Sequence, residues 1–253
     1  MTDIEARYSW QLHKEMPFQM RAAMGHITNG TTVFISGNNP DIQLSEETVW
    51  YQGGIYSYPA SAIQMSVSSS DAAATCSVVI NGLDAAYLPI SEIVTLTGQT
   101  AVTTTKSYLR IQNAYVLANP TSGDIYIGTG TVTAGVPATV YERIFDGHNR
   151  TESGRYTVPA NRTFYLTHGT ISHGTDSLNA FITGTLVYRL YGLPFHNAAV
   201  VNLNNKFIDF WFDYPLALPA KTDIETRAKC SKQQINAVST SFEGLLITED
   251  QNA

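Results

Sequence analysis

The sequence predicts an all-β protein with two consecutive β-sandwich units, the second of them jelly-roll-like, preceded by an extended N-terminal arm. Short runs of alternating polar and apolar residues recur at the spacing of roughly 8–12 residues that is typical of sandwich strands. The connections between them are rich in Gly, Asn, Asp and Pro, as turns between antiparallel strands are. Charged residues make up only 14% of the 253 residues, well below the roughly 25% of an average soluble domain, which argues against coiled coils and disordered charged tails.

Residues 1–44 form the predicted arm, because they lack the alternation seen further on. Pro17 followed by FQMRAAM predicts a short helix with Met20 and Met24 on one face, since Pro fits the first helical turn. Two interpretations remain open: a terminal segment packed over its own core, and an arm that reaches a neighbouring subunit, where aromatic and Met side chains are favoured. The candidate partner-binding residues of the arm are Trp10, Phe18, Met20 and Met24.

The first β unit is predicted to span residues 45–136 as an antiparallel meander. In its run Ile90–Thr97, Ile90, Val94 and Leu96 share one face, so one side of the strand faces inward and the other faces solvent. The segment 128–137, GTGTVTAGVP, is rich in Gly and Thr and is predicted to link the two units.

The second unit is predicted to span residues 137–253. Its eight alternating runs match the eight strands of a jelly roll. In the run 207–214, FIDFWFDY, Phe207 and Trp211 share the more polar face with Asp209 and Asp213. Large aromatic side chains on a solvent-facing side of a strand indicate a binding partner. A contact with another subunit is favoured over a small ligand. Phe207 and Trp211 are therefore the candidate interface residues of this unit.

Composition argues against several classes of partner and location. The net charge of −6 and the lack of any basic cluster argue against nucleic acid, which needs a basic face. No apolar run is long enough to cross a membrane, and the first residues lack the pattern of a signal peptide. Cys76 and Cys230 are read as free, partly buried thiols, with a bridge between them as the alternative.

Candidate chemistry is sparse, and the sequence predicts that the protein is not an enzyme and holds no cofactor or metal. His168 and His173 lie five positions apart in a strand-like run, which places them on opposite faces and not on one metal. Paired carboxylates such as Glu46 and Glu47 suit a glycosidase only if they face each other across a cleft. They lie near a predicted turn instead.

Several short segments, taken in the order in which they occur along the sequence, resemble virion structural proteins of tailed bacteriophages. The resemblance is to the short-tailed phages of cyanobacteria and other marine bacteria especially. Each segment combines a turn with a strand and is weakly specific alone, but together they cover most of residues 37–230. They are GNNPDI (37–42), ETVWYQGGIYSYP (47–59), NGLDAAY (81–87) with SEIVTL (91–96), TTTKSYLRI (103–111), YTVPANRT (156–163) and PAKTDIETR (219–227).

The resemblance implies a non-enzymatic protein on the outer surface of the capsid. It implies a homotrimeric cement or decoration protein whose partners are the major capsid protein and its own copies. A tail-associated adaptor or fibre with a glycan-binding jelly roll is the alternative. A carbohydrate-active enzyme on a jelly-roll scaffold is a third hypothesis, and it requires two carboxylates about 5–10 Å apart in a groove.

Overall fold

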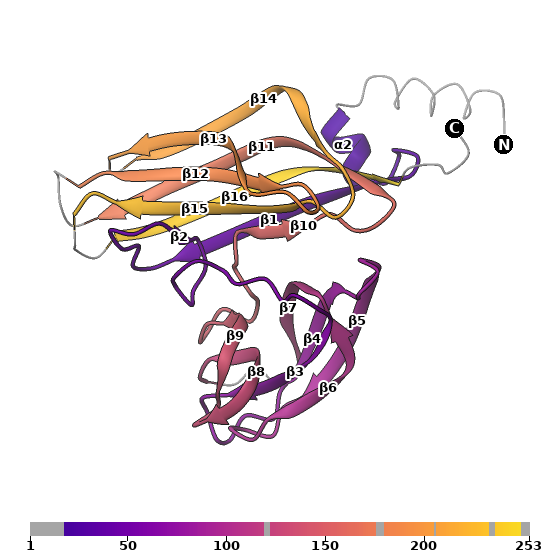
Figure 1. Cartoon of the computed structure of the whole chain (residues 1–253), viewed down its shortest axis with the longest axis vertical. Coiled ribbons are helices and arrows are strands. Elements are labelled where there is room, and N and C mark those ends of the chain that lie inside the picture. Colours follow the sequence, from indigo (N-terminus) through magenta and orange to yellow (C-terminus); the bar gives the residue numbers. More distant parts are fainter. Residues whose placement is uncertain (1–17, 119–121, 176–179, 205, 233–235, 249–253) are drawn as a thin grey trace, which may run out of the picture.

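The computed structural model describes residues 18–118, 122–175, 180–204, 206–232 and 236–248, and these form one short helix and sixteen strands (Figure 1). Every pairing between strands is antiparallel, which confirms the all-β class. The elements are α2 (Phe18–Ala23), β1 (Gly30–Asn39), β2 (Glu47–Thr48), β3 (Ile63–Ser69), β4 (Ser77–Leu83), β5 (Pro89–Thr95), β6 (Val102–Tyr108), β7 (Arg110–Ala118), β8 (Ile125–Thr133), β9 (Val136–Ile144), β10 (Arg155–Thr157), β11 (Arg162–Thr175), β12 (Ile182–Arg189), β13 (His196–Leu203), β14 (Phe207–Leu218), β15 (Asp223–Cys230) and β16 (Asn236–Thr248).

The strands form four small sheets. Sheet A has the order β1-β16-β11-β14, and sheet B has the order β10-β15-β12-β13, with β2 paired to β15. Sheet C has the order β6-β3-β8-β9, and sheet D has the order β5-β4-β7. Figure 1 shows sheets A and B together in one part of the molecule and sheets C and D in the other. We call these parts the A/B unit and the C/D unit.

Each unit has its own apolar core. In the A/B unit, Phe164 and Phe242 from sheet A meet Leu186 and Ile224 from sheet B. A second apolar cluster, around Ile171 from sheet A and Ile182 from sheet B, also lies in this unit. In the C/D unit, strands of sheet C and sheet D supply one larger cluster that includes Met65, Val67, Val78, Ile80 and Ile127. The alternation read from the sequence is therefore what buries one face of each strand.

Residues 30–39 of the predicted arm are part of the protein's own fold. These residues form β1, which pairs along its whole length with β16, from Gly30 opposite Ile247 to Asn39 opposite Val238. Residues 30–39 thus supply an outer strand of sheet A, and the C/D unit is inserted between β2 and β10. The predicted short helix is confirmed as α2, in which Met24 donates its backbone N–H to the carbonyl of Met20 at 3.0 Å.

The predicted linker at 128–137 is wrong, because it forms a hairpin. β8 and β9 pair from Ile125 opposite Ile144 to Thr133 opposite Val136. Ala134 and Gly135 connect them with φ values of 48° and 81°, and a two-residue loop with both φ values positive matches the twist of the two strands. The C/D unit therefore extends to Ile144 and not to residue 136.

Candidate functional site

The outer face of sheet A carries the two exposed aromatic residues predicted for β14. Phe207 is 62% exposed and Trp211 is 59% exposed, whereas Phe210, one position before Trp211, packs against the core. A row of paired residues crosses this face from Phe34 to Glu243, His168 and Trp211. The predicted alternation of β14 is confirmed from Phe207 to Asp213 and ends there, because Tyr214, at an inward position of the pattern, is 89% exposed.

Trp211 is held in place by its neighbours. Its ring stacks on the His168 ring with centroids 4.1 Å apart and planes at 22°. His168 Nδ1 lies 3.2 Å from Glu243 Oε1, and His168 Nε2 pairs with Asp209. A side chain that is already ordered loses less entropy when a partner covers it.

β14 also lies at the end of sheet A, with a strand partner on one side only among the described residues. An edge strand has unpaired backbone groups on its free side, and proteins either protect such edges or use them for pairing. The exposed aromatic residues therefore lie where a partner can contact both side chains and backbone.

Helix α2 borders the same face. Met20 and Met24 are each 54% exposed, whereas Ala22 is buried. A groove of about 300 Å³ is lined by Ala22, Ala23, Thr32–Phe34 and Glu243–Leu245. Because Glu243 contacts His168 and His168 stacks on Trp211, this groove beside α2 borders the face that carries Trp211. Phe18 lies in α2, its side chain lies outside the described residues, and Trp10 lies outside them altogether.

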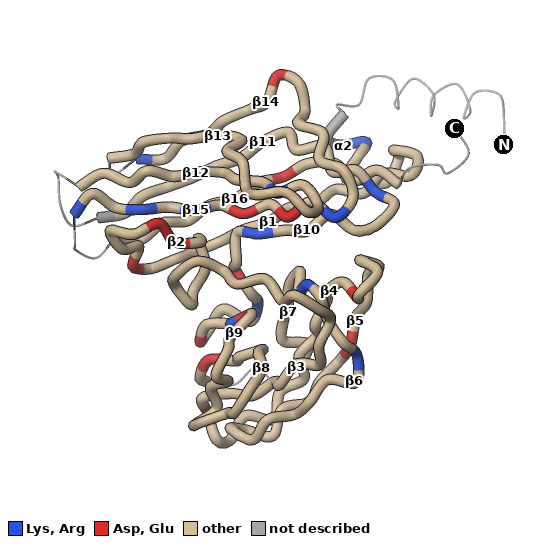
Figure 2. The backbone as a smooth tube through the Cα atoms, in the orientation of Figure 1, with Lys and Arg blue, Asp and Glu red and all other residues tan. Residues whose placement is uncertain are grey.

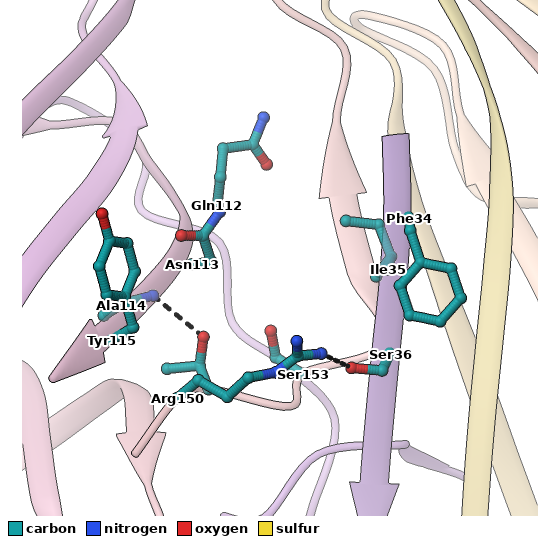
Figure 3. A pocket seen from close by; sticks show the side chains of 10 residues that line it. Phe34, Ile35, Ser36, Gln112, Asn113, Ala114, Tyr115, Arg150 and Ser153 are labelled. Atoms are coloured by element: carbon teal, nitrogen blue, oxygen red, sulfur yellow. Dashed lines mark hydrogen bonds between the residues drawn. The ribbon is translucent and has the colours of Figure 1, made fainter. Parts of the chain in front are cut away.

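A second hollow, of about 410 Å³, lies between β1 and β7 (Figure 3). Its floor is residues 150–153, where the Thr151 hydroxyl accepts a 3.0 Å hydrogen bond from the Ala114 N–H. Arg150 crosses the hollow and donates to the Ser36 hydroxyl, with Phe34 and Tyr115 at its two rims in Figure 3. Its ten lining residues are uncharged except for Arg150 and offer hydroxyl, amide and aromatic groups.

Buried charged pairs join the two units, and sequence reasoning missed them. Arg110 on β7 donates to both carboxylate oxygens of Asp223 on β15, at 2.9 and 3.2 Å, and the two side chains are only 6% and 4% exposed. Arg155 on β10 pairs with Glu142 on β9, and both are almost fully buried. Figure 2 shows such charges along β15 and β10, where the A/B unit meets the C/D unit. The only signal in the sequence was charge at strand positions that alternation assigns to the interior.

Burial and ion pairing shift the pKa values of these acids in opposite directions. Burial alone would raise the pKa of Asp223, but hydrogen bonds from Arg110, Thr157 and Arg189 hold it below its usual range. Burial raises the pKa of Glu142 to about 7, against the opposing influence of Arg155 and Ser153. Asp223 is therefore a stable anion in the folded protein, while Glu142 titrates near neutrality.

The described residues contain no group of three His, Cys, Asp or Glu side chains placed to hold a metal ion. His168 is half-buried on the outer face of sheet A, and His173 is buried beside Asn236. Within the same residues, no helix has the length and apolar character needed to cross a membrane. Cys76 and Cys230 are both buried free thiols, as predicted.

No protein-family model matches the chain, and no curated protein is similar to it. Among solved structures, the infectious bursal disease virus Gx strain structure is 9% identical, with 88% of this chain and 73% of that chain covered and a TM-score of 0.25. The VP2 subviral particle of the same virus is also 9% identical, with 92% and 78% covered and a TM-score of 0.23. Likeness at this level is too weak to carry an argument about this chain.

Proposed function

We propose that the protein is a non-enzymatic structural protein of a short-tailed phage particle, which acts by binding other proteins of the particle. One observation carries the proposal: Phe207 and Trp211 are exposed on the edge strand of sheet A, and Trp211 is held in place by stacking on His168. Exposed and ordered aromatic residues are typical hot spots of protein interfaces. The resemblance of residues 37–230 to phage virion proteins supports the same assignment.

We further infer that the A/B unit is a jelly roll. Apart from the two-residue β2, its eight strands divide into two four-stranded sheets, and successive strands alternate between sheets except for the β12–β13 hairpin. That is the pairing expected of two interleaved Greek keys. The C/D unit is then a second sandwich inserted after the first strand of the jelly roll.

More specifically, we propose that the protein is a capsid cement protein on the outer capsid surface. Its partners are then the major capsid protein and two further copies of this chain. DNA packed in a capsid presses outward, and a protein that bridges neighbouring capsomers adds buried area at joints that would otherwise open. A standard interface buries about 1,600 Å², and repetition around a closed shell multiplies modest local affinity through effective concentration. The face that carries Trp211 and Phe207 supplies apolar area for such contacts, and the exposed Met20 and Met24 supply more.

The alternative is a tail-associated adaptor or fibre that binds a host glycan. It is favoured by the hollow of Figure 3, where Phe34 and Tyr115 lie at the rims and Arg150 and Asn113 offer polar groups. Aromatic rings beside planar polar side chains suit a sugar ring.

Replacement of Trp211 tests the interface directly. Trp211→Ala should dissociate the oligomer or lower its melting temperature, measured by sedimentation velocity and calorimetry. Ile93→Ala is the matched control, because Ile93 is also 59% exposed but lies on the C/D unit. If the Trp211→Ala protein stays an intact oligomer with an unchanged melting temperature, Trp211 is not an interface residue.

A further inference from the structure

Cationic and aromatic side chains alternate in one continuous series across the contact between the two units. We call it the junction series. Each cation lies within 4.4–5.6 Å of the ring centroids on either side of it, which is the range of a cation–π contact. In order, the series is Arg227, Phe195, Arg189, Tyr58, Arg110, Tyr87, Lys221 and Tyr191.

Three of the four cations in the series have a carboxylate partner. Arg227 pairs with Glu225, and Arg189 and Arg110 both pair with Asp223. Lys221 takes part in none of the ion pairs among the described residues. Its ammonium nitrogen lies 5.5 Å from the Tyr87 ring and 5.0 Å from the Tyr191 ring. The last cation of the series is thus the one without an anion.

Lys221 and Tyr191 lie in an open groove of about 580 Å³ at this end of the series. Tyr191 is 66% exposed, so much of its ring faces solvent. Lys221 has a φ of 67°, a left-handed conformation that is uncommon and costly for a residue with a side chain. Such strain is often retained at binding sites.

The charges around the groove favour an anion. Arg110, Arg189 and Lys221 line it with a single acid, Asp223, although the whole chain carries a net charge of −6. Asp223 already accepts hydrogen bonds from Arg110, Arg189 and Thr157. The groove therefore has excess positive charge, and the ammonium of Lys221 can donate to an incoming anion.

We propose that this groove binds an acidic saccharide. The carboxylate of the sugar accepts hydrogen bonds from the Lys221 ammonium, and the sugar ring lies against the exposed Tyr191. The ammonium lies 5.0 Å from the centroid of the Tyr191 ring, so the two groups are close enough to contact the carboxylate and the ring of one monosaccharide. The groove lies apart from the Trp211 face, so this proposal and the proposed function can fail separately.

Isothermal titration with three probes tests the site: the galacturonic acid dimer, the uncharged galactose dimer and inorganic phosphate. The acidic dimer should bind, and its affinity should fall as salt is added. The uncharged dimer and phosphate should each bind at least about tenfold more weakly, since each lacks one of the two contacts. Equal binding of phosphate would mean an adventitious ion only, and no binding of the acidic dimer would overturn the proposal.

Two variants and a control locate the binding on the protein. Lys221→Gln and Tyr191→Ala should each weaken binding of the acidic dimer by about tenfold or more. Lys229→Gln is the control, because Lys229 is an exposed lysine on β15 outside the groove, and it should bind like the parent. Thermal unfolding of each variant shows that it is folded. Folded Lys221→Gln and Tyr191→Ala variants with unchanged affinity would place the sugar elsewhere and contradict the assignment.

Discussion

Replacement of Asp223 by Asn tests whether the buried charges lock the two units together. The substitution keeps the size of the side chain but removes the negative charge that neutralises Arg110 and Arg189. Arg110 is then a cation with only 6% of its side chain exposed and no carboxylate partner. Loss of one partner from a buried ion pair costs about 3–5 kcal/mol, so the folding equilibrium should shift by roughly a hundredfold to several thousandfold.

Urea unfolding followed by circular dichroism measures this loss as a lower midpoint with an unchanged slope. Asp209→Asn is the control, because Asp209 pairs with His168 at a surface where 47% of its side chain is exposed, and it should cost about 1 kcal/mol or less. Because the folded pKa of Asp223 lies below its unfolded value, the parent loses this contribution as the pH falls through that lowered pKa. Asp223→Asn should lack that acid-dependent loss. A loss of unfolding free energy in Asp223→Asn as small as that in Asp209→Asn would refute the claim that the buried charges lock the two units together.

Three further results are expected. Deletion of residues 1–17 should abolish docking onto capsids while circular dichroism of the β sheets is unchanged; undiminished docking would show that this segment is not an anchor. Because the folded pKa of Glu142 is about 7 against an ordinary 4.5, the protein should lose stability as the pH rises between these values. Glu142→Gln should have a flatter pH profile of melting temperature, and an equally steep profile would point to another group. Cys76 and Cys230, both buried with their thiol pKa values raised by burial, should react with a thiol reagent only after denaturation, so rapid reaction of the native protein would contradict their burial.

Local patterns predicted local features of this molecule. Alternation along residues 207–214 placed Phe207 and Trp211 on the exposed face of β14, because a strand repeats every two residues. The Pro17 signal with the spacing of Met20 and Met24 predicted α2. Each of these features is set by neighbours within a few positions along the chain.

Features that depend on distant pairing were not predicted. β1 pairs with β16, with Gly30 opposite Ile247. The sequence of residues 30–39 does not indicate that its strand partner lies at the other end of the chain. Ala134 occupies a turn position where Asn or Asp is the usual signal, so the β8–β9 hairpin resembled a linker. The buried pair of Arg110 and Asp223 joins side chains 113 positions apart, and the pattern of either strand alone gives no reason to bring them together.

Co-sedimentation of the purified protein with DNA-filled capsids that lack it tests the proposed function most directly. The number of copies bound to each particle at saturation should reach hundreds and rise in multiples of three, as a trimeric cement protein on a closed shell requires. The Trp211→Ala protein should bind in smaller numbers under the same conditions. A handful of copies, or binding only when tails are attached, would contradict the cement role and place the protein at the tail.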